Sequence, residues 1–407
     1  MRFDLFWVLM GRTAYVFAPL YLIPFAYGFA YGDSLAGSFL ALGVLAAILG
    51  MVFGNMGRSH MRQLSVQEGT FFLLAVWFLL AVLGMLPFHL AGLHLSPADT
   101  FFECISALTT TGMTAFGDAL PPSLLLWRAL MSWFGGLLFI VILVTVLPVV
   151  SGCFGVDFNV RQARLFSPLW NRMTRPMREM TLLYIAITAL SVGIYLMAGD
   201  DIFTALILAL FTIASGAGPM TGGVPPSPDL MLGAGLVALL SALPLLTLWQ
   251  LIHRRSGTIL TRHMELRAFF LLFLAAGVLL AIPSLLHGAR PIAEALGYSF
   301  FYAISFLSTN GLMLQEAAPF HTSAALLLIL LAIIGGCMGS AAGGFRISRV
   351  LVLISLAWSE LLRTLHPRMV LAVRQGGEVV PLHSAGRILV LAFFFAAVFS
   401  VSSLLIA

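Results

Sequence analysis

The chain has 407 residues, of which 60% are hydrophobic and only 9% are charged, with a formal net charge of +5. Soluble globular domains carry about 25% charged residues, so this composition excludes an ordinary soluble protein and predicts a multi-pass helical membrane protein. The basic residues gather in alternate loops, so the positive net charge reflects membrane topology. Nucleic-acid binding is a poor explanation of that charge.

All 21 basic residues are arginines, and most of them gather in alternate loops, with only Arg128 and Arg290 on the opposite side. Such clusters mark the cytoplasmic side of a membrane, so residues 55–69, 151–180, 253–267 and 346–387 are predicted to be cytoplasmic, together with the N-terminus. The opposite loops are acidic. An acidic outer mouth would attract cations, although the positive-inside bias leaves acidic outer loops by itself.

Residues 1–57 are predicted to form a helical hairpin with members at 5–30 and 34–55. Pro19 and Pro24 should bend the first member. No small-residue cleavage site stands out near the start, so we interpret the first apolar run as a retained span.

Residues 69–152 are predicted to form a first pore unit, in which a short helix at 97–108 lies between two spans and ends in a threonine-rich turn. Non-helical backbone at membrane depth must be buried in protein or line water, so this pattern is typical of a pore loop. Carbonyls and hydroxyls of Thr110, Thr111 and Gly112 would then replace the water around a small cation. Taken alone, the stretch favours a simpler interpretation as a polar interfacial loop.

The return span of this unit carries Arg128 and the pair Gly135-Gly136. Arg128 near the outer boundary needs an acidic partner, and Glu103 on the short helix is the candidate; snorkelling to lipid headgroups is an equal alternative. The glycine pair would let another helix or the loop backbone approach closely.

The same pattern recurs at residues 178–253, the second pore unit. A short helix should begin at Asp200-Asp201, where acidic residues suit its positive dipole end, and a return span should run from about 230 to 252. The candidate ion ligands of this turn are Ser215, Gly216, Ala217 and Gly218.

A third pore unit is predicted at residues 266–365, with a span at 266–286 and a short helix at 291–306. Its candidate ion ligands are Thr309, Asn310 and Gly311. Three such loops in register make an internal repeat. The predicted fold is therefore an all-α polytopic membrane protein, with repeated span–pore loop–span units around a central pore and an extra helical hairpin before them.

The return span of the third unit differs, because it meets a glycine-rich segment at 335–344 before it resumes at Phe345. Each glycine costs about 1 kcal/mol relative to alanine in a helix interior, so the helix must break in mid-membrane. We expect a flexible flap that gates the pore; a close-packed helix crossing is the alternative. Arg346 and Arg349 follow it and should face the inner vestibule or the inner surface. The flap residues are Gly335, Gly336, Cys337, Met338, Gly339, Ser340, Ala341, Ala342, Gly343 and Gly344.

The last predicted elements are a small β-hairpin around Gly376-Gly377 and an apolar run within residues 384–407, the first span of a fourth unit. The chain stops there, inside hydrophobic residues. We expect a truncated form of a longer chain, with a natural protein that lacks the fourth pore loop as the alternative.

Several stretches resemble the membrane subunit of Trk-type potassium uptake systems, in the superfamily that includes Ktr and HKT transporters. They are LTTTGMT at 108–114, LPPSLLLWRALMSWFGGLLFIVILVTVLP at 120–148, STNGL at 308–312, IGGCMGSAAGGFRISRV at 334–350 and LHPRMVLAVRQGGEVVPL at 365–382. The resemblance implies four span–loop–span repeats around one potassium pore per protomer, in a homodimer of the bacterial-type cytoplasmic (inner) membrane. A cytosolic nucleotide-binding regulatory subunit would dock on the inner face.

The resemblance also implies roles for single residues. Gly112 and Gly311 would be selectivity-filter glycines, with potassium held at Thr111, Gly112 and Gly311, and residues 335–344 would be the gating loop. Arg349 would be the basic residue at the inner end of the pore. An ungapped match places Ala217 where the family has its filter glycine, while Gly216 or Gly218 could serve if the loop is one residue out of step.

No cofactor is expected beside the transported ion, and no enzymatic activity. None of the nine histidines pairs with Ser, Cys or Asp at a recognisable spacing, and HExxH is missing, which argues against an intramembrane enzyme. A solute-coupled secondary transporter with broken helices would place ionisable residues deep in the spans, where few are seen. Cys104, Cys153 and Cys337 share no metal-ligand spacing and are expected to be packed thiols.

Overall fold

A computed structural model describes most of the chain as helices. The described residues are 4–57, 66–92, 96–116, 120–145, 174–216, 227–254, 264–286, 291–313, 322–366, 374–375, 378–380 and 382–406. Contacts divide the chain into two compact units: Met1–Phe139 with Asp201–Gly218, and Ile140–Asp200 with Pro219–Ala407. The five segments inferred from the sequence repeats stay a prediction.

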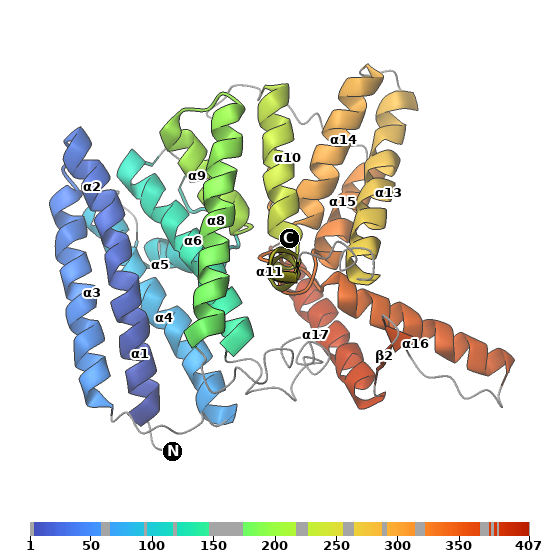
Figure 1. Cartoon of the computed structure of the whole chain (residues 1–407), viewed down its shortest axis with the longest axis horizontal. Coiled ribbons are helices and arrows are strands. Elements are labelled where there is room, and N and C mark those ends of the chain that lie inside the picture. Colours follow the sequence, from blue (N-terminus) through green and yellow to red (C-terminus); the bar gives the residue numbers. More distant parts are fainter. Residues whose placement is uncertain are drawn as a thin grey trace. The chain divides into compact units, whose positions relative to one another are not determined.

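The first unit begins with the expected helical hairpin (Figure 1). Its first member is α1 (Asp4–Phe17), a 3-10 turn η1 (Ala18–Tyr21) and α2 (Leu22–Tyr31), and α3 (Ala36–Met56) packs along it. Pro19 lies within the 3-10 turn, where the missing N–H of proline costs least. Pro19 thus interrupts the α-helical pattern between α1 and α2, whereas Pro24 lies within the first turn of α2.

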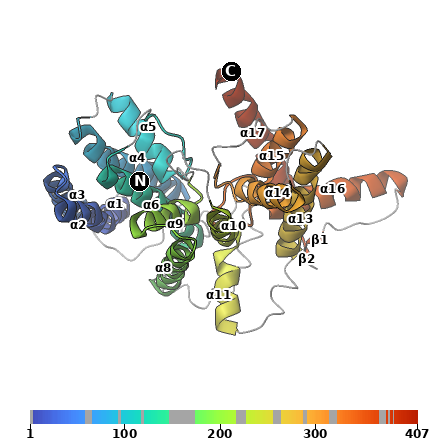
Figure 2. The same cartoon turned by 90° about the horizontal axis from the view of Figure 1, so that it is seen from above.

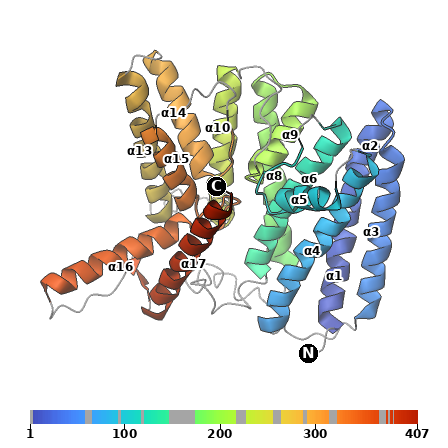
Figure 3. The same cartoon turned by 180° about the vertical axis from the view of Figure 1, so that it is seen from behind.

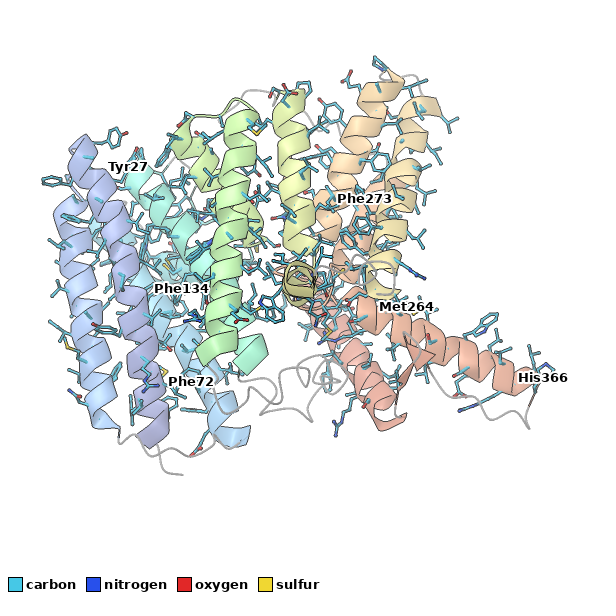
Figure 4. All side chains as sticks on the ribbon, in the orientation of Figure 1. Tyr27, Phe72, Phe134, Met264, Phe273 and His366 are labelled. Carbon is cyan, nitrogen blue, oxygen red and sulfur yellow. The ribbon has the colours of Figure 1, made fainter. Side chains whose placement is uncertain are left out.

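Four more helices complete the first unit: α4 (Val66–Leu90), α5 (Pro97–Leu108), most of α6 (Pro122–Thr145) and α9 (Ile202–Ile213). The fully buried Trp127 of α6 stacks on Tyr21 at 4.3 Å between ring centroids. Phe134, labelled in Figure 4, packs against Phe17 with 5.2 Å between the ring centroids. Aromatic packing thus anchors α6 on the N-terminal hairpin.

The two short helices of this unit begin with polar caps. Ser96 and Asp99 form a reciprocal capping box at the start of α5, as the Ser-Pro signal predicts. Asp201 accepts hydrogen bonds from the backbone N–H groups of Phe203 and Thr204 at the start of α9. The bonds from Thr204 and Phe203 lower the pKa of the Asp201 carboxyl, because they stabilise its ionised form.

The second unit contains α8 (Thr174–Met197) and a bundle of α13 (Met264–Leu286), α14 (Ile292–Leu307) and α15 (Thr322–Ile334). Phe273 of α13, labelled in Figure 4, packs edge-on against Phe300 of α14 at 5.5 Å. The ends of α13 and α14 agree with the predicted span at 266–286 and the predicted short helix at 291–306 to within two residues, whereas α8 begins at Thr174, about five residues before the span expected from about 179.

The return span of the second pore unit is broken, contrary to the continuous helix predicted at 230–252. Helix α10 (Pro228–Ala242) stops before Leu243-Pro244, and α11 (Leu245–Arg254) begins after it. Figure 2 shows α10 nearly end-on and α11 along its length. Leu243 is extended, with ψ at 145°, as a residue before proline prefers.

The C-terminal part holds α16 (Ile347–Leu365), strands β1 (Arg374–Gln375) and β2 (Glu378–Val379), and α17 (Leu382–Ile406). Figures 1 and 3 show α16 at a steep angle to α13 and α15, and its exposed face includes Trp358. The strands pair antiparallel, Arg374 with Val379, which confirms the β-hairpin. Gly376-Gly377 lie outside the described residues.

Within the described ranges, seven helices have the length and hydropathy to cross a membrane. They are Phe6–Tyr31, Ala36–Met56, Phe71–Leu90, Pro122–Ile142, Met177–Met197, Met264–Leu286 and Ser384–Leu405. Four shorter apolar helices accompany them: Ile202–Ile213, Pro228–Ala242, Ile292–Leu307 and Ser323–Ile334. This is the all-α, polytopic membrane fold that the sequence predicts.

Candidate functional site

Three short helices, α5, α9 and α14, end in the same backbone turn. The residues Thr110, Ser215 and Thr309 have φ of 56°, 55° and 55°, in the left-handed region. We call the segments that follow loop 1 (109–116), loop 2 (214–216) and loop 3 (308–313), each limited to its described residues. Loops 1 and 2 belong to the first compact unit and loop 3 to the second.

The three turns share one hydrogen-bond pattern, which aligns them residue by residue. In each, the residue after the left-handed one donates its N–H to a carbonyl five residues back, which is the 6→1 bond of a Schellman motif. These bonds are Thr111 N to Ser106 O at 2.9 Å, Gly216 N to Phe211 O at 3.0 Å and Asn310 N to Ser305 O at 2.9 Å. The described part of loop 2 is therefore in step with loops 1 and 3, and Ala217 follows in the sequence as Gly112 and Gly311 do.

Hydroxyl residues occupy the left-handed position although glycine is the residue that fits it without strain. A β-branched residue such as Thr110 or Thr309 rarely adopts positive φ, and strain of this kind persists where surrounding structure and function require it. The repeat of a Thr or Ser in the left-handed region makes these turns the candidate functional element.

Loops 1 and 3 continue into extended backbone through a left-handed glycine, Gly112 at φ 77° and Gly311 at φ 63°. A serine on the short helix holds each extended stretch. Ser106 Oγ donates to Met113 O at 2.6 Å, and Ser305 Oγ donates to Leu312 O at 2.8 Å. The sequence analysis missed both serines; aligning the turns would have found them at one shared position.

The predicted pairing of Arg128 with Glu103 is confirmed. Arg128 Nε lies 2.5 Å from Glu103 Oε1, with side-chain exposures of 6% and 0%. The other carboxylate oxygen accepts from Thr114 Oγ1 at 3.1 Å and from Ala115 N at 2.9 Å. A buried ion pair therefore supports the far end of loop 1.

Arg128 also reaches the filter-like backbone itself. Its Nη2 donates to Gly112 O at 3.5 Å and to Met113 O at 3.4 Å, which are long, weak bonds. Its guanidinium lies 5.6 Å from the ring centroid of Phe211 on α9. Arg128 thus ties the carbonyls of loop 1 to the helix that carries loop 2.

The close approach predicted at Gly135-Gly136 is found at Gly135. A Cβ there would lie within 1.9 Å of Leu108 O, at the end of α5. No side chain fits against a backbone carbonyl at that distance. Gly135 therefore lets the backbone of α6 pack directly against the C-terminal end of α5.

The glycine-rich segment interrupts the third return span as predicted, and the chain resumes as helix at Ile347, two residues later than expected. The segment closes on itself. Phe345 N donates to Ile333 O and Arg346 N to Ile334 O, both at 2.8 Å, so the chain returns to the end of α15. The predicted break in the helix is confirmed.

Two glycines are required where this loop closes. Gly335 and Gly344 have φ of 71° and 81°, and a Cβ on Gly335 would meet Gly343 O at 2.1 Å. A helix crossing packed by side chains would not need this backbone. The arrangement is a compact loop with backbone against backbone.

Arg346 does not face a vestibule or the inner surface, contrary to the sequence prediction. Its side chain folds back into the loop, where Nη1 donates to Cys337 O at 3.0 Å and to Ser340 Oγ at 3.1 Å. A guanidinium at 9% exposure needs such acceptors, and the loop supplies them. Arg349 Nη1 donates to Phe345 O at 3.3 Å, and its role at the pore end stays a prediction.

Two side chains outside the loop hold it in place. Thr309 Oγ1, in the strained turn of loop 3, accepts from Gly343 N at 2.5 Å. Glu265 Oε1, at the start of α13, accepts from Met338 N at 2.6 Å. The first contact joins the candidate filter to the candidate gate by one hydrogen bond, and neither contact was predictable from the sequence.

The break between α10 and α11 also meets this loop. Cys337 N donates to Ala242 O at 3.3 Å, and Leu245 N donates to Gly339 O at 3.1 Å. Helix ends leave such groups without intrahelical partners. The glycine-rich loop therefore supplies hydrogen-bond partners for backbone groups at the unpredicted break between α10 and α11.

The remaining predicted site residues fall into two groups. Ala217 and Gly218 lie outside the described residues, as does Cys153, whereas Cys104 and Cys337 are buried free thiols as expected. Asn310 is buried and donates through Nδ2 to Ser241 Oγ at 2.9 Å, so its side chain points into the protein.

Repeated short helices that end in hydroxyl-rich turns, held beside apolar spans, define a polytopic membrane transport protein of the re-entrant-loop class. A family model described as TrkH, cation transport protein, matches residues 38–218 and 242–406. This chain therefore belongs to the TrkH family of cation transport proteins, which confirms the resemblance.

Bacterial relatives agree with that assignment. The Trk system potassium uptake protein TrkH of Escherichia coli (strain K12) is 29% identical over 393 residues, which cover 94% of this chain and 81% of the relative. TrkG of the same strain is 31% identical over 330 residues, covering 78% and 67%. The crystal structure of the potassium transporter TrkH from Vibrio parahaemolyticus matches with a TM-score of 0.89 at 26% identity, over 98% of this chain and 85% of that one.

Proposed function

We propose that this chain transports potassium ions across the bacterial cytoplasmic membrane, with loops 1, 2 and 3 forming a filter of backbone carbonyls. Membership in the TrkH family and relatives named as potassium uptake proteins support the transported ion. The seven apolar helices support the membrane location.

The observation that carries the proposal is the shared left-handed turn at Thr110, Ser215 and Thr309. Each turn ends a short helix, and the C-terminal end of a helix carries partial negative charge. A cation is stabilised there, and the extended carbonyls after Gly112 and Gly311 replace its hydration shell. Such binding needs no proton transfer, so the mechanism requires no enzyme chemistry.

The glycine-rich loop at 335–344 acts as the gate in this proposal. It is held by the Thr309 side chain on the filter side and by the Glu265 side chain on α13, and it closes through backbone hydrogen bonds to the end of α15. A loop held by a few hydrogen bonds moves at lower cost than a packed helix. The Arg346 side chain keeps the loop compact through its hydrogen bonds to Cys337 O and Ser340 Oγ.

The assembly extends the proposal beyond one chain. The protein works as a homodimer with a cytosolic nucleotide-binding regulatory subunit on its inner face, and its N-terminus is cytoplasmic. The arginine-rich loops support this orientation, since cytoplasmic loops collect basic residues. No nucleic acid takes part.

Ion flux into liposomes tests the function. We expect rubidium and potassium uptake to exceed sodium uptake, and Gly112→Val to abolish it, because valine cannot adopt the left-handed backbone without strain. Gly193→Ala is the matched control, since a Cβ at Gly193 meets nothing within 4 Å. Equal flux in wild type and Gly112→Val would refute the filter.

A further inference from the structure

Loop 2 departs from its neighbours at Gly216, the residue after the left-handed position. We propose that Gly216 is a packing glycine that seats loop 2 on Ser132 of α6, and that Ser132 is a positioning residue for this part of the filter. The inference rests on the proposed function, which assigns loop 2 to the ion path. It assigns Gly216 a role other than that of a filter glycine.

The space around Gly216 is limited by a single oxygen atom. A Cβ at this position would lie 2.1 Å from Ser132 Oγ, whereas Ser132 Cβ would be 3.4 Å away and Phe211 Cδ1 3.8 Å away. The last two are ordinary contacts. Gly216 is not among the glycines with positive φ, so its backbone does not itself demand glycine. The Ser132 hydroxyl is the atom that excludes a side chain.

Loop 3 uses a related contact at the equivalent position. Asn310 takes the place of Gly216, and its Nδ2 donates to Ser241 Oγ at 2.9 Å. Ser241 lies on α10, the return helix of the second pore unit, as Ser132 lies on α6, the return helix of the first. Each loop thus rests on a serine from the return helix of the preceding unit. In loop 2 the side chain is absent and the serine meets bare backbone.

Ser132 is itself an unusual group. Its side chain is 1% exposed, and its hydroxyl has no hydrogen-bond partner among the described residues. A buried hydroxyl without a partner is costly, so an alanine here would be favoured if only packing mattered. The cost is consistent with a hydroxyl that sets the position of the loop 2 backbone.

A double-mutant cycle tests the seat. Gly216→Ala should lower potassium flux about tenfold, because the inserted methyl would meet Ser132 Oγ at 2.1 Å and either the Ser132 side chain or loop 2 must shift. Ser132→Ala removes the one obstructing oxygen. The double variant Gly216→Ala/Ser132→Ala should therefore recover flux to within about twofold of Ser132→Ala alone, since neighbouring sites couple. Gly193→Ala, in open space, should change nothing.

Selectivity separates positioning from plain stability. We expect Ser132→Ala alone to keep the unfolding temperature and to lower the potassium-to-sodium flux ratio, because loop 2 loses its seat and not its fold. If Gly216→Ala does not fold, recovery of folding in the double variant supports the seat equally. The inference is overturned if Gly216→Ala alone is as active as wild type, or if the double variant is as impaired as Gly216→Ala. Absence of potassium flux in wild type would instead refute the proposed function.

Discussion

Besides Gly216, a second position separates loop 2 from loops 1 and 3, and it lies on the short helix before each turn. Ser106 and Ser305 precede the left-handed residue by four in loops 1 and 3, and each donates to the carbonyl after the glycine, on Met113 or Leu312. Loop 2 has Phe211 there, which has no hydroxyl to donate. The turn is therefore common to all three loops, and the support of the extended backbone is not.

This difference teaches that the helix end and the filter strand are separate structural elements. The Schellman turn follows from how each short helix stops, whereas the extended carbonyls need their own hydrogen-bond donors. Phe211 instead offers its ring to Arg128, whose guanidinium reaches the carbonyls of loop 1. The helix before loop 2 thus helps to position loop 1 through Arg128, and at this position it offers no side-chain donor to the backbone of loop 2.

The largest expected effect comes from breaking the charge pair found in loop 1. Loop 3 has Tyr302 at the position of Glu103, three residues before the serine. Glu103→Gln leaves Arg128 buried without its counter-charge, which costs about 3–5 kcal/mol. Thermal unfolding in detergent should show a clear drop in Tm. The double variant Glu103→Gln/Arg128→Gln should recover part of it, and an unchanged Tm in the single variant would contradict the account.

The next effect concerns the contact between α6 and the end of α5, which precedes loop 1. Gly135→Ala drives a methyl into Leu108 O, which is backbone and cannot rotate away, at a cost of about 1–3 kcal/mol. We expect a loss of potassium flux. Gly235→Ala on α10 is the matched control, because its Cβ would meet Ile304 Cγ2 at 3.9 Å. Equal flux in the two variants would show that the contact with α5 does not position the loop.

A gating comparison sets loop 3 against loop 1. Thr309→Gly and Thr110→Gly both relieve a left-handed backbone. Only Thr309→Gly removes the acceptor of Gly343 N–H, a bond worth about 1 kcal/mol net. Flux without activation should rise about fivefold in Thr309→Gly. Thr309→Ser should behave as wild type, and a similar rise in Thr110→Gly would contradict a specific latch.

The smallest effect concerns the serines that distinguish the loops. Ser305→Ala and Ser106→Ala each remove one donor to a filter carbonyl, so the potassium-to-sodium flux ratio should fall about threefold. Phe211→Ser on α9 should leave the ratio unlowered, because Phe211 donates no hydrogen bond to a filter carbonyl. If the serine variants keep their selectivity, the difference between the loops has no functional meaning.

The sequence predicts local features of this protein well. The Ser-Pro start and the threonine-rich end locate the short helix at 97–108 without error. Opposite charges on neighbouring elements identify Glu103 and Arg128. Five glycines in ten residues predict the break after α15, since no helix tolerates them. Two of these signals are local in the sequence, and the charge pair joins helices α5 and α6, which follow each other in the chain.

Features that depend on tertiary contacts are not predictable in the same way. Pro244 marks a real break, yet Pro87 and Pro283 lie inside continuous helices, so proline alone gives no decision. A left-handed threonine is unexpected because glycine is the usual choice, and Thr309 reveals its reason only through Gly343. The sequence predicts Arg346 at a surface or vestibule, and only the fold of the glycine-rich loop shows that its side chain is buried there.

Ion density tests the central claim most directly. Crystals of the full protein soaked in rubidium or thallium salt would show an anomalous peak wherever the ion binds. The account predicts a peak in contact with the carbonyl oxygens of Gly112 and Gly311. An occupied ion site elsewhere, with no peak beside these two carbonyls, would contradict it.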